Sequence, residues 1–349
     1  MRKIKTVQIL LFKRKKGVKE VNKKRWLALG IFIVLIVVYM TSSVGSIEEE
    51  TQATSALTKY INGNNSGWAT TVYKEGSGQK LALLKIEGII MENDSGSNTL
   101  STYNHRVFLK QIEAAFTDPD IKGIILQLNS PGGGVYESDE VYHRIMELKA
   151  QYKKPLVVYM SQQAASGAYY IAMAADKIYA NRNTMTGSIG VIISTYNYSE
   201  LAKKIGVKDV TFKSAANKDL LNPMRPITAE EQSIMQAMID ETYNYFVDIV
   251  AKGRNLDREK VLQLADGRIY SGVQAKNAGL VDELGYLEDA IDDTARLAKT
   301  SDPQVLLYEN PGPDLWSWIM SLRAPVIDLQ GLSEQMQQQS APQILYLSH

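Results

Sequence analysis

The chain has 349 residues, of which 45% are hydrophobic and 22% are charged, and it contains no cysteine. This length supplies enough apolar material for one large or two medium domains. The absence of cysteine excludes a disulfide scaffold, a cysteine-ligated metal centre and a thiol nucleophile. The three histidines, His105, His143 and His349, do not have the helical spacing of metal ligands, so we expect neither a zinc hydrolase nor a cofactor.

The net charge of +1 conceals a strong asymmetry, because residues 1–25 carry 11 lysines and arginines against one acid. Residues 27–45 have no charge and would span about 28 Å as a helix, close to the thickness of a bilayer core. The position of the basic segment therefore favours a membrane over a nucleic acid as its partner. We predict a single-pass anchor over residues 26–45 with a cytoplasmic N-terminus. A cleaved signal peptide is the alternative.

Residues 46–79 lack apolar periodicity and are predicted to form a stalk. From Lys80 onward, short apolar runs alternate with amphipathic segments. This alternation predicts an α/β layered fold with a mostly parallel sheet over residues 80–300, followed by a tail at 301–349. The predicted strands are 80–90, 121–128, 156–160, 189–193, 210–213 and 304–308, and the predicted helices are 103–116, 135–149, 168–175, 198–205, 228–252 and 287–299.

Two segments that follow predicted buried strands could carry chemistry. The first is Asn-Ser-Pro-Gly-Gly-Gly at 129–134, whose glycines would let backbone N–H groups approach a ligand. It lacks the Lys-Ser or Lys-Thr of a nucleotide-binding loop, and a simple tight turn is its plainer interpretation. The second contains Ser166 among small residues, where a nucleophile at a helix start or an ordinary capping serine would both fit.

A serine nucleophile needs a base, and the histidines are poorly placed for that role. Lysine is the remaining choice, because burial in an apolar cleft favours the neutral amine. Residue patterns alone leave Lys213 and Lys218 as the leading candidates.

Five motifs occur in this order: SPGGG (130–134), AASGAYYI (164–171), TGSIGVI (186–192), FKSAANKD (212–219) and ADGRIYSG (265–272). Together they resemble those of bacterial signal peptide peptidase A, a Ser–Lys protease family of the ClpP/crotonase-like fold. The resemblance covers about residues 80–290 and includes the N-terminal anchor. It implies that Ser166 is the nucleophile, Lys218 the general base and Ser188 the residue that orients the lysine. It also implies an oxyanion hole at Gly133 and Gly167.

The resemblance leaves Lys213 as the alternative base, because some members of the family place the lysine there. The sequence departs from the family pattern at Ala168 and Ala215, where glycine is common, and we expect altered loop flexibility rather than lost activity. The implied function is degradation of remnant signal peptides by a membrane-bound homo-oligomer, often an octamer, outside the cytoplasm. We expect the apolar end of the tail, 344–347, to dock in a substrate cleft. A crotonase-like thioester enzyme and a non-catalytic membrane scaffold are the competing interpretations.

Overall fold

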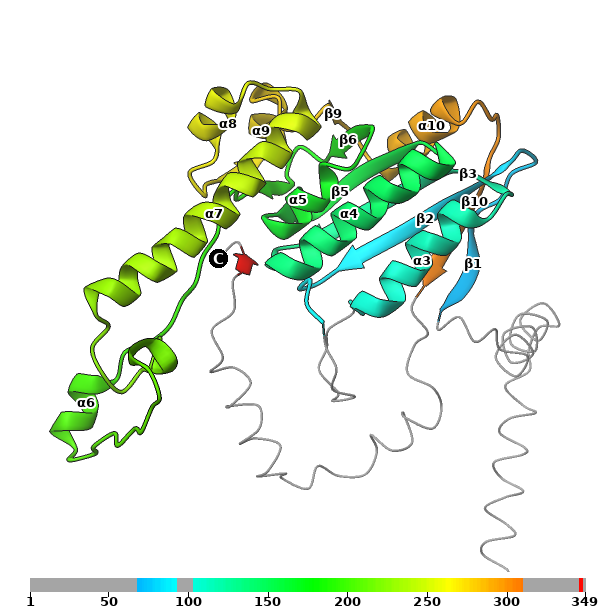
Figure 1. Cartoon of the computed structure of the whole chain (residues 1–349). Coiled ribbons are helices and arrows are strands. Elements are labelled where there is room, and N and C mark those ends of the chain that lie inside the picture. The colour runs from blue at the N-terminus through cyan, green and yellow to red at the C-terminus, as the bar shows by residue number, and fades with distance from the viewer. Residues whose placement is uncertain (1–67, 93–102, 310–344, 348–349) are drawn as a thin grey trace, which may run out of the picture. The chain divides into compact units, whose positions relative to one another are not determined.

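The computed structural model describes residues 68–92, 103–309 and 345–347. A nine-stranded sheet runs through the described body, with the strand order β1-β10-β2-β3-β5-β6-β9, while β7 pairs with β5 and β8 pairs with β7 (Figure 1). The path from β10 to β9 is parallel throughout, whereas β1 is antiparallel to β10 and β8 is antiparallel to β7. The predicted α/β class with a mostly parallel sheet is therefore confirmed. The strands are β1 (Ala69–Lys74), β2 (Lys80–Glu87), β3 (Ile121–Ser130), β5 (Leu156–Ala165), β6 (Lys177–Ala180), β7 (Met185–Gly187), β8 (Ile269–Ser271), β9 (Glu283–Leu284) and β10 (Gln304–Glu309).

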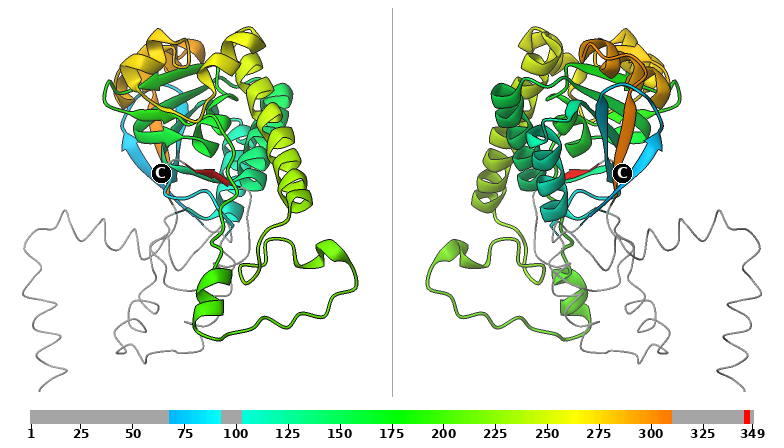
Figure 2. Two further views of the ribbon diagram at one scale, coloured as in Figure 1. Left: turned by 90° about the vertical axis from the view of Figure 1, so that its left-hand side faces the viewer. Right: turned by 90° about the vertical axis from the view of Figure 1, so that its right-hand side faces the viewer.

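The sheet is covered on both faces, which explains why its central strands are almost continuously apolar. Successive side chains of a strand point to opposite faces. Leu81 and Leu83 of β2 accordingly join the apolar cluster that contains Ile291 of α10. Leu84 and Ile86 of the same strand join the larger cluster on the other face, formed with α3, α4 and α5. Figures 1 and 2 show the resulting layers. The helices are α3 (His105–Thr117), α4 (Val135–Tyr152), α5 (Gly167–Ala172), α6 (Ser199–Lys204), the 3₁₀ helix η1 (Ala216–Asp219), α7 (Ala229–Arg254), α8 (Arg258–Leu264), α9 (Gly272–Asn277) and α10 (Leu287–Leu297).

Residues 192–228, here called the lobe, extend away from the sheet past the N-terminal end of α7 (Figures 1 and 2). The lobe contains α6 and η1. The structure has no strand at 189–193 or at 210–213, so these two predictions are wrong. A strand needs a neighbour for its backbone hydrogen bonds, and the lobe offers the segment 210–213 none. Its apolar side chains are instead open to solvent, with Phe212 94% and Val210 73% exposed.

The body is larger at both ends than the sequence predicted. β1 lies inside the segment 46–79 that we expected to be stalk, and β10 continues the sheet beyond residue 300. β1 was missed because it is an edge strand whose side chains are mostly exposed, so it has no buried stripe to detect. The predicted anchor at 26–45 lies outside the described residues, and within the described ranges no helix is long and apolar enough to cross a membrane.

Candidate active site

Ser166 occupies a sharp turn between the end of β5 and the start of α5. Its backbone has φ 56° and ψ −117°, in a region that non-glycine residues rarely adopt. The side chain is fully buried, and its Oγ has no hydrogen-bond partner among the described residues. An unpaired buried hydroxyl on a strained strand-to-helix turn is costly, and such strain concentrates at functional sites. The arrangement is similar to the elbow that presents a nucleophile in other hydrolases.

The neighbours of Ser166 fix α5 in place. Tyr169 is buried, which raises the pKa of its phenol well above the ordinary value, and its hydroxyl donates to the Leu280 carbonyl at 2.8 Å. Gly167 packs so tightly that a Cβ there would lie 2.3 Å from the Oγ of Ser138 in α4. This position therefore has no space for a side chain larger than that of glycine.

Ser188 lies beside this turn. The Ser166 N–H donates to the Gly187 carbonyl at 2.8 Å, which brings the residue after Gly187 next to the serine. Ser188 is 6% exposed and also has a positive φ of 50°. The Ser188 hydroxyl forms no hydrogen bond to a described residue, so it remains available to a group that enters the site.

The glycine run that the sequence presented as a loop forms a short strand, β4 (Gly132–Gly134). One edge of β4 is held by Ile90, whose N–H donates to Gly132 O at 2.9 Å and whose carbonyl accepts from Gly134 N at 2.7 Å. The N–H and C=O of one peptide unit point in opposite directions. Gly133 therefore turns both its N–H and its C=O to the other edge. A Cβ on Gly167 would be 3.3 Å from the Gly133 nitrogen, so this N–H lies at the start of α5.

The free edge of β4 is occupied by the end of the chain. The strand β11 (Leu345–Leu347) pairs antiparallel with β4, with Leu345 opposite Gly134, Tyr346 opposite Gly133 and Leu347 opposite Gly132. This pairing bears out the expected docking of the tail. Addition of an extended segment to a strand edge is a common mode of peptide recognition. The Gly133 edge is thus a site where a peptide backbone can lie next to Ser166.

The two candidate bases differ in their surroundings, and neither is bonded to Ser166. The Lys213 amine donates to Asp219 Oδ1 and to the Ala216 carbonyl, both at 2.7 Å, so a carboxylate holds it in an ion pair. Lys218 lies in the lobe on η1, a short helix with no buried residue, and its amine has no partner among the described residues. We expected the lysine to be buried in the cleft. Within one chain this is wrong, because the lobe carries Lys218 away from the sheet.

The histidines are engaged elsewhere. Both ring nitrogens of His105 are hydrogen-bonded, at 2.7 Å to the Tyr103 hydroxyl and at 2.7 Å to Glu140. His143 is exposed and pairs with Glu147 on the same helix. His349 lies outside the described residues.

Sequence patterns missed Arg225, which holds the lobe to α7. Its guanidinium donates to both carboxylate oxygens of Asp219, at 2.8 and 2.9 Å, and to the buried Glu231. Hydrogen bonds from Arg225 hold the pKa of Asp219 below its usual range and lower that of Glu231 to about 2. The spacing of an arginine six residues from each acid gave no signal, because the three meet only when the chain turns back onto α7.

Comparison with known proteins bears on the chemistry of this site. The model of Peptidase family S49 matches residues 148–301. A protein of Enterococcus faecium, provisionally named signal peptide peptidase SppA, is 40% identical over 296 residues, which is 83% of this chain and 85% of that protein. The chain belongs to peptidase family S49. A protein of Methanocaldococcus jannaschii, provisionally named a protease, is 42% identical over 210 residues, which is 59% of this chain and 67% of that protein.

A third relative extends the comparison to plants. The chloroplastic serine protease SPPA of Arabidopsis thaliana is 34% identical over 236 residues, 64% of this chain and 35% of its own length. Together with the S49 match, these relatives make the chain a serine protease. This result favours peptide hydrolysis over the thioester and scaffold interpretations.

Proposed function

We propose that this S49 protein is a membrane-anchored endopeptidase that degrades signal peptides left after their release from secreted proteins. Ser166 serves as nucleophile and Lys218 as general base, with Ser188 orienting the lysine amine. The N–H groups of Gly133 and Gly167 form the oxyanion hole. The observation that carries the proposal is the buried, unpartnered hydroxyl of Ser166 beside a strand edge that already accepts an extended segment.

The reaction follows from these groups. The neutral Lys218 amine takes the proton of Ser166 as its Oγ attacks the scissile carbonyl carbon. The carbonyl oxygen becomes negative, and N–H donors fixed in advance at Gly133 and Gly167 stabilise it without reorganisation. The C–N bond then breaks as the protonated lysine returns its proton to the leaving amine. Water, deprotonated by the same amine, hydrolyses the resulting ester and restores the serine.

We propose that the lysine comes from a chain other than the one that holds the serine. Ser166 Oγ has no hydrogen-bond partner within the described ranges, while Lys218 is exposed on a lobe that projects from the body. The lobe also exposes Tyr196, Ile205 and Phe212 at 75%, 67% and 94%, an apolar surface suited to contact with a partner. We therefore propose a homo-oligomer in which the lobe of one subunit delivers Lys218 to Ser166 of another. The family resemblance suggests an octamer.

The substrate is proposed to be an apolar peptide bound as an extended strand on β4. Backbone pairing with β4 is indifferent to side chains, which suits signal peptides of varied sequence. An uncleaved anchor at 26–45 would place the body outside the cytoplasm and close to the bilayer from which these peptides emerge. The docked tail would then occupy the same edge, and we propose that it can be trimmed there.

Complementation between inactive subunits tests both the dyad and its arrangement. Ser166→Ala and Lys218→Ala should each lower kcat for an apolar peptide by about 10³-fold or more. Oligomers assembled from both variants should regain activity at about one quarter of the sites if the chains mix at random. Lys213→Ala is the matched control, because it removes the other candidate amine. Full activity in Ser166→Ala would refute the proposed peptidase, and no recovery in mixed oligomers would refute the shared dyad.

A further inference from the structure

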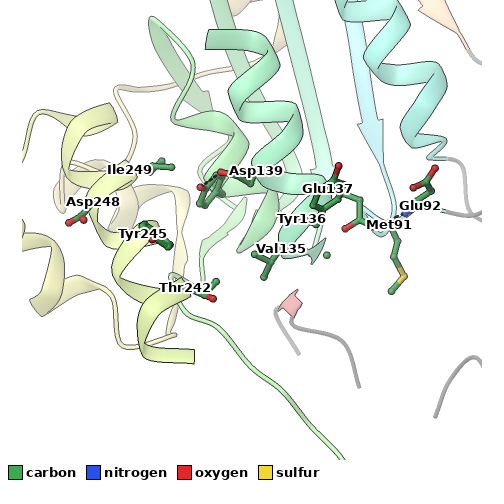
Figure 3. Close-up of a pocket in the computed structure, with 12 residues that line it drawn as sticks. Met91, Glu92, Val135, Tyr136, Glu137, Asp139, Thr242, Tyr245, Asp248 and Ile249 are labelled. Carbon is green, nitrogen blue, oxygen red and sulfur yellow. Dashed lines mark hydrogen bonds between the residues drawn. The ribbon is translucent and has the colours of Figure 1, made fainter. Parts of the chain in front are cut away.

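A cavity of about 750 Å³ opens directly beside the peptide-binding edge. Figure 3 shows its two walls, the first turn of α4 with the residues after β2 on one side and α7 on the other. The cavity shares Gly134 with β4, so it is continuous with the site that holds β11. Its lining residues are Met91, Glu92, Gly134, Val135, Tyr136, Glu137, Asp139, Tyr170, Thr242, Tyr245, Asp248 and Ile249.

The direction of β11 fixes which part of a bound peptide reaches this cavity. The pairing is antiparallel, with Tyr346 opposite Gly133 and Leu345 opposite Gly134. A substrate bound in the same direction, with its reacting residue opposite Gly133, therefore runs past Gly134 toward Val135 in its N-terminal half. Each extended residue advances about 3.3 Å. Residues three or more positions before the cleaved bond would then enter the cavity.

The cavity wall is acidic. Among the described residues, four carboxylates line it and no lysine, arginine or histidine does. Two of the four form ion pairs, Glu92 with Arg106 at 2.5 Å and Asp248 with Arg258 at 2.7 Å. Asp139 is exposed and accepts a hydrogen bond from Tyr170 at 2.6 Å, and Glu137 accepts from the Glu92 N–H at 3.1 Å. Neither Glu137 nor Asp139 forms an ion pair with a described residue, so two negative charges remain uncompensated in this cavity.

We infer that the cavity binds the lysine or arginine side chains that precede the apolar stretch of a substrate. The inference rests on the proposed function, because it concerns signal peptides bound on β4. These peptides carry a positively charged segment just before their apolar segment. Binding of that segment by Glu137 and Asp139 would place the apolar segment across Ser166. The tyrosines Tyr136 and Tyr245 add aromatic faces, which also attract ammonium and guanidinium groups. The site thereby sets both the direction of the substrate and the position at which it is cut.

Two peptides test this inference on the full-length protein. They share one apolar sequence and differ only in the residues four to six positions before the cleaved bond, three lysines in one and three glutamines in the other. We expect kcat/KM to be about fivefold higher for the lysine peptide because its KM is lower. This difference should shrink in 0.5 M salt. Asp139→Asn should reduce the ratio between the two peptides, and Asp139→Lys should reverse it.

The matched control is Glu147→Gln, which removes a carboxylate from the same helix outside the cavity and should leave the ratio unchanged. Equal kcat/KM for the two peptides in the wild-type protein, with cleavage still dependent on Ser166, would overturn the inference and leave the proposed function standing. Cleavage of neither peptide would overturn both. If Asp139→Asn changed the oligomeric state but not the ratio, the cavity would be an interface between copies and the inference would be wrong.

Discussion

Replacement of Gly133 by alanine should damage catalysis more than stability. A Cβ at this position would lie 1.9 Å from the carbonyl oxygen of Ile90, whereas real Cβ contacts are not closer than 3.0 Å. The obstacle is backbone rather than the end of a flexible side chain. Accommodation of alanine therefore requires β4 and Ile90 to separate by about 1.1 Å. That movement stretches both hydrogen bonds between Ile90 and β4, each of which contributes about 1 kcal/mol. The free energy of unfolding should therefore fall by about 2 kcal/mol.

The same displacement carries the Gly133 N–H away from the developing oxyanion. A shift of about 1 Å in a catalytic group can cost about 10²-fold, and loss of an oxyanion donor costs about 10² to 10³-fold in kcat. We expect kcat for an apolar peptide to fall in that range, with a smaller change in KM. Steady-state kinetics and thermal unfolding of the same preparation separate the two effects.

Gly190→Ala is the matched control. A Cβ at Gly190 has its nearest neighbour at 3.4 Å, an ordinary contact, so this variant should keep its activity within about twofold. If Gly133→Ala retained full kcat while unfolding at the wild-type temperature, Gly133 would not supply the oxyanion hole and the geometry derived for β4 would be wrong.

Three further predictions concern the lobe and the tail. Arg225→Gln should leave Glu231 buried without its cation and release the lobe from α7. The released lobe should be cut more readily within 192–228 in limited proteolysis, and kcat should fall. Arg225→Lys should restore part of the protease resistance and part of kcat. Because Arg225 lowers the pKa of Glu231 to about 2 in the folded state, this carboxylate stabilises the fold fully above its unfolded pKa of about 4.3 and loses that effect as the pH falls toward 2. Between pH 6 and pH 2, the free energy of unfolding measured in urea should therefore fall less in Arg225→Gln than in the wild type. Removal of residues 344–349 should lower KM for a short apolar peptide at least about twofold with little change in kcat, because β11 competes for β4; an unchanged KM would show that the tail does not compete.

Local patterns in the sequence were sufficient for most of the body. The apolar runs at 121–128 and 156–160 predicted β3 and β5, and the amphipathic segment at 228–252 predicted α7. These features depend on neighbouring residues and on burial periodicity, which a single sequence displays directly. The placement of Ser166 at the start of a helix after a buried strand followed from the same patterns.

The tertiary structure decided what the site can do, because its parts meet through contacts between distant segments. Ile90 fixes the direction in which Gly133 presents its N–H, and no local rule relates these two residues. Likewise, only the fold reveals that Lys218 lies on a projecting lobe, while Ser166 stays buried and its hydroxyl has no partner in the described part of the chain. The sequence thus supplied the candidate groups, Ser166 with Lys218 or Lys213, and their order along the chain. Whether these groups can meet depends on how distant segments of the chain pack and on which surfaces stay exposed. Neither property can be read from local periodicity.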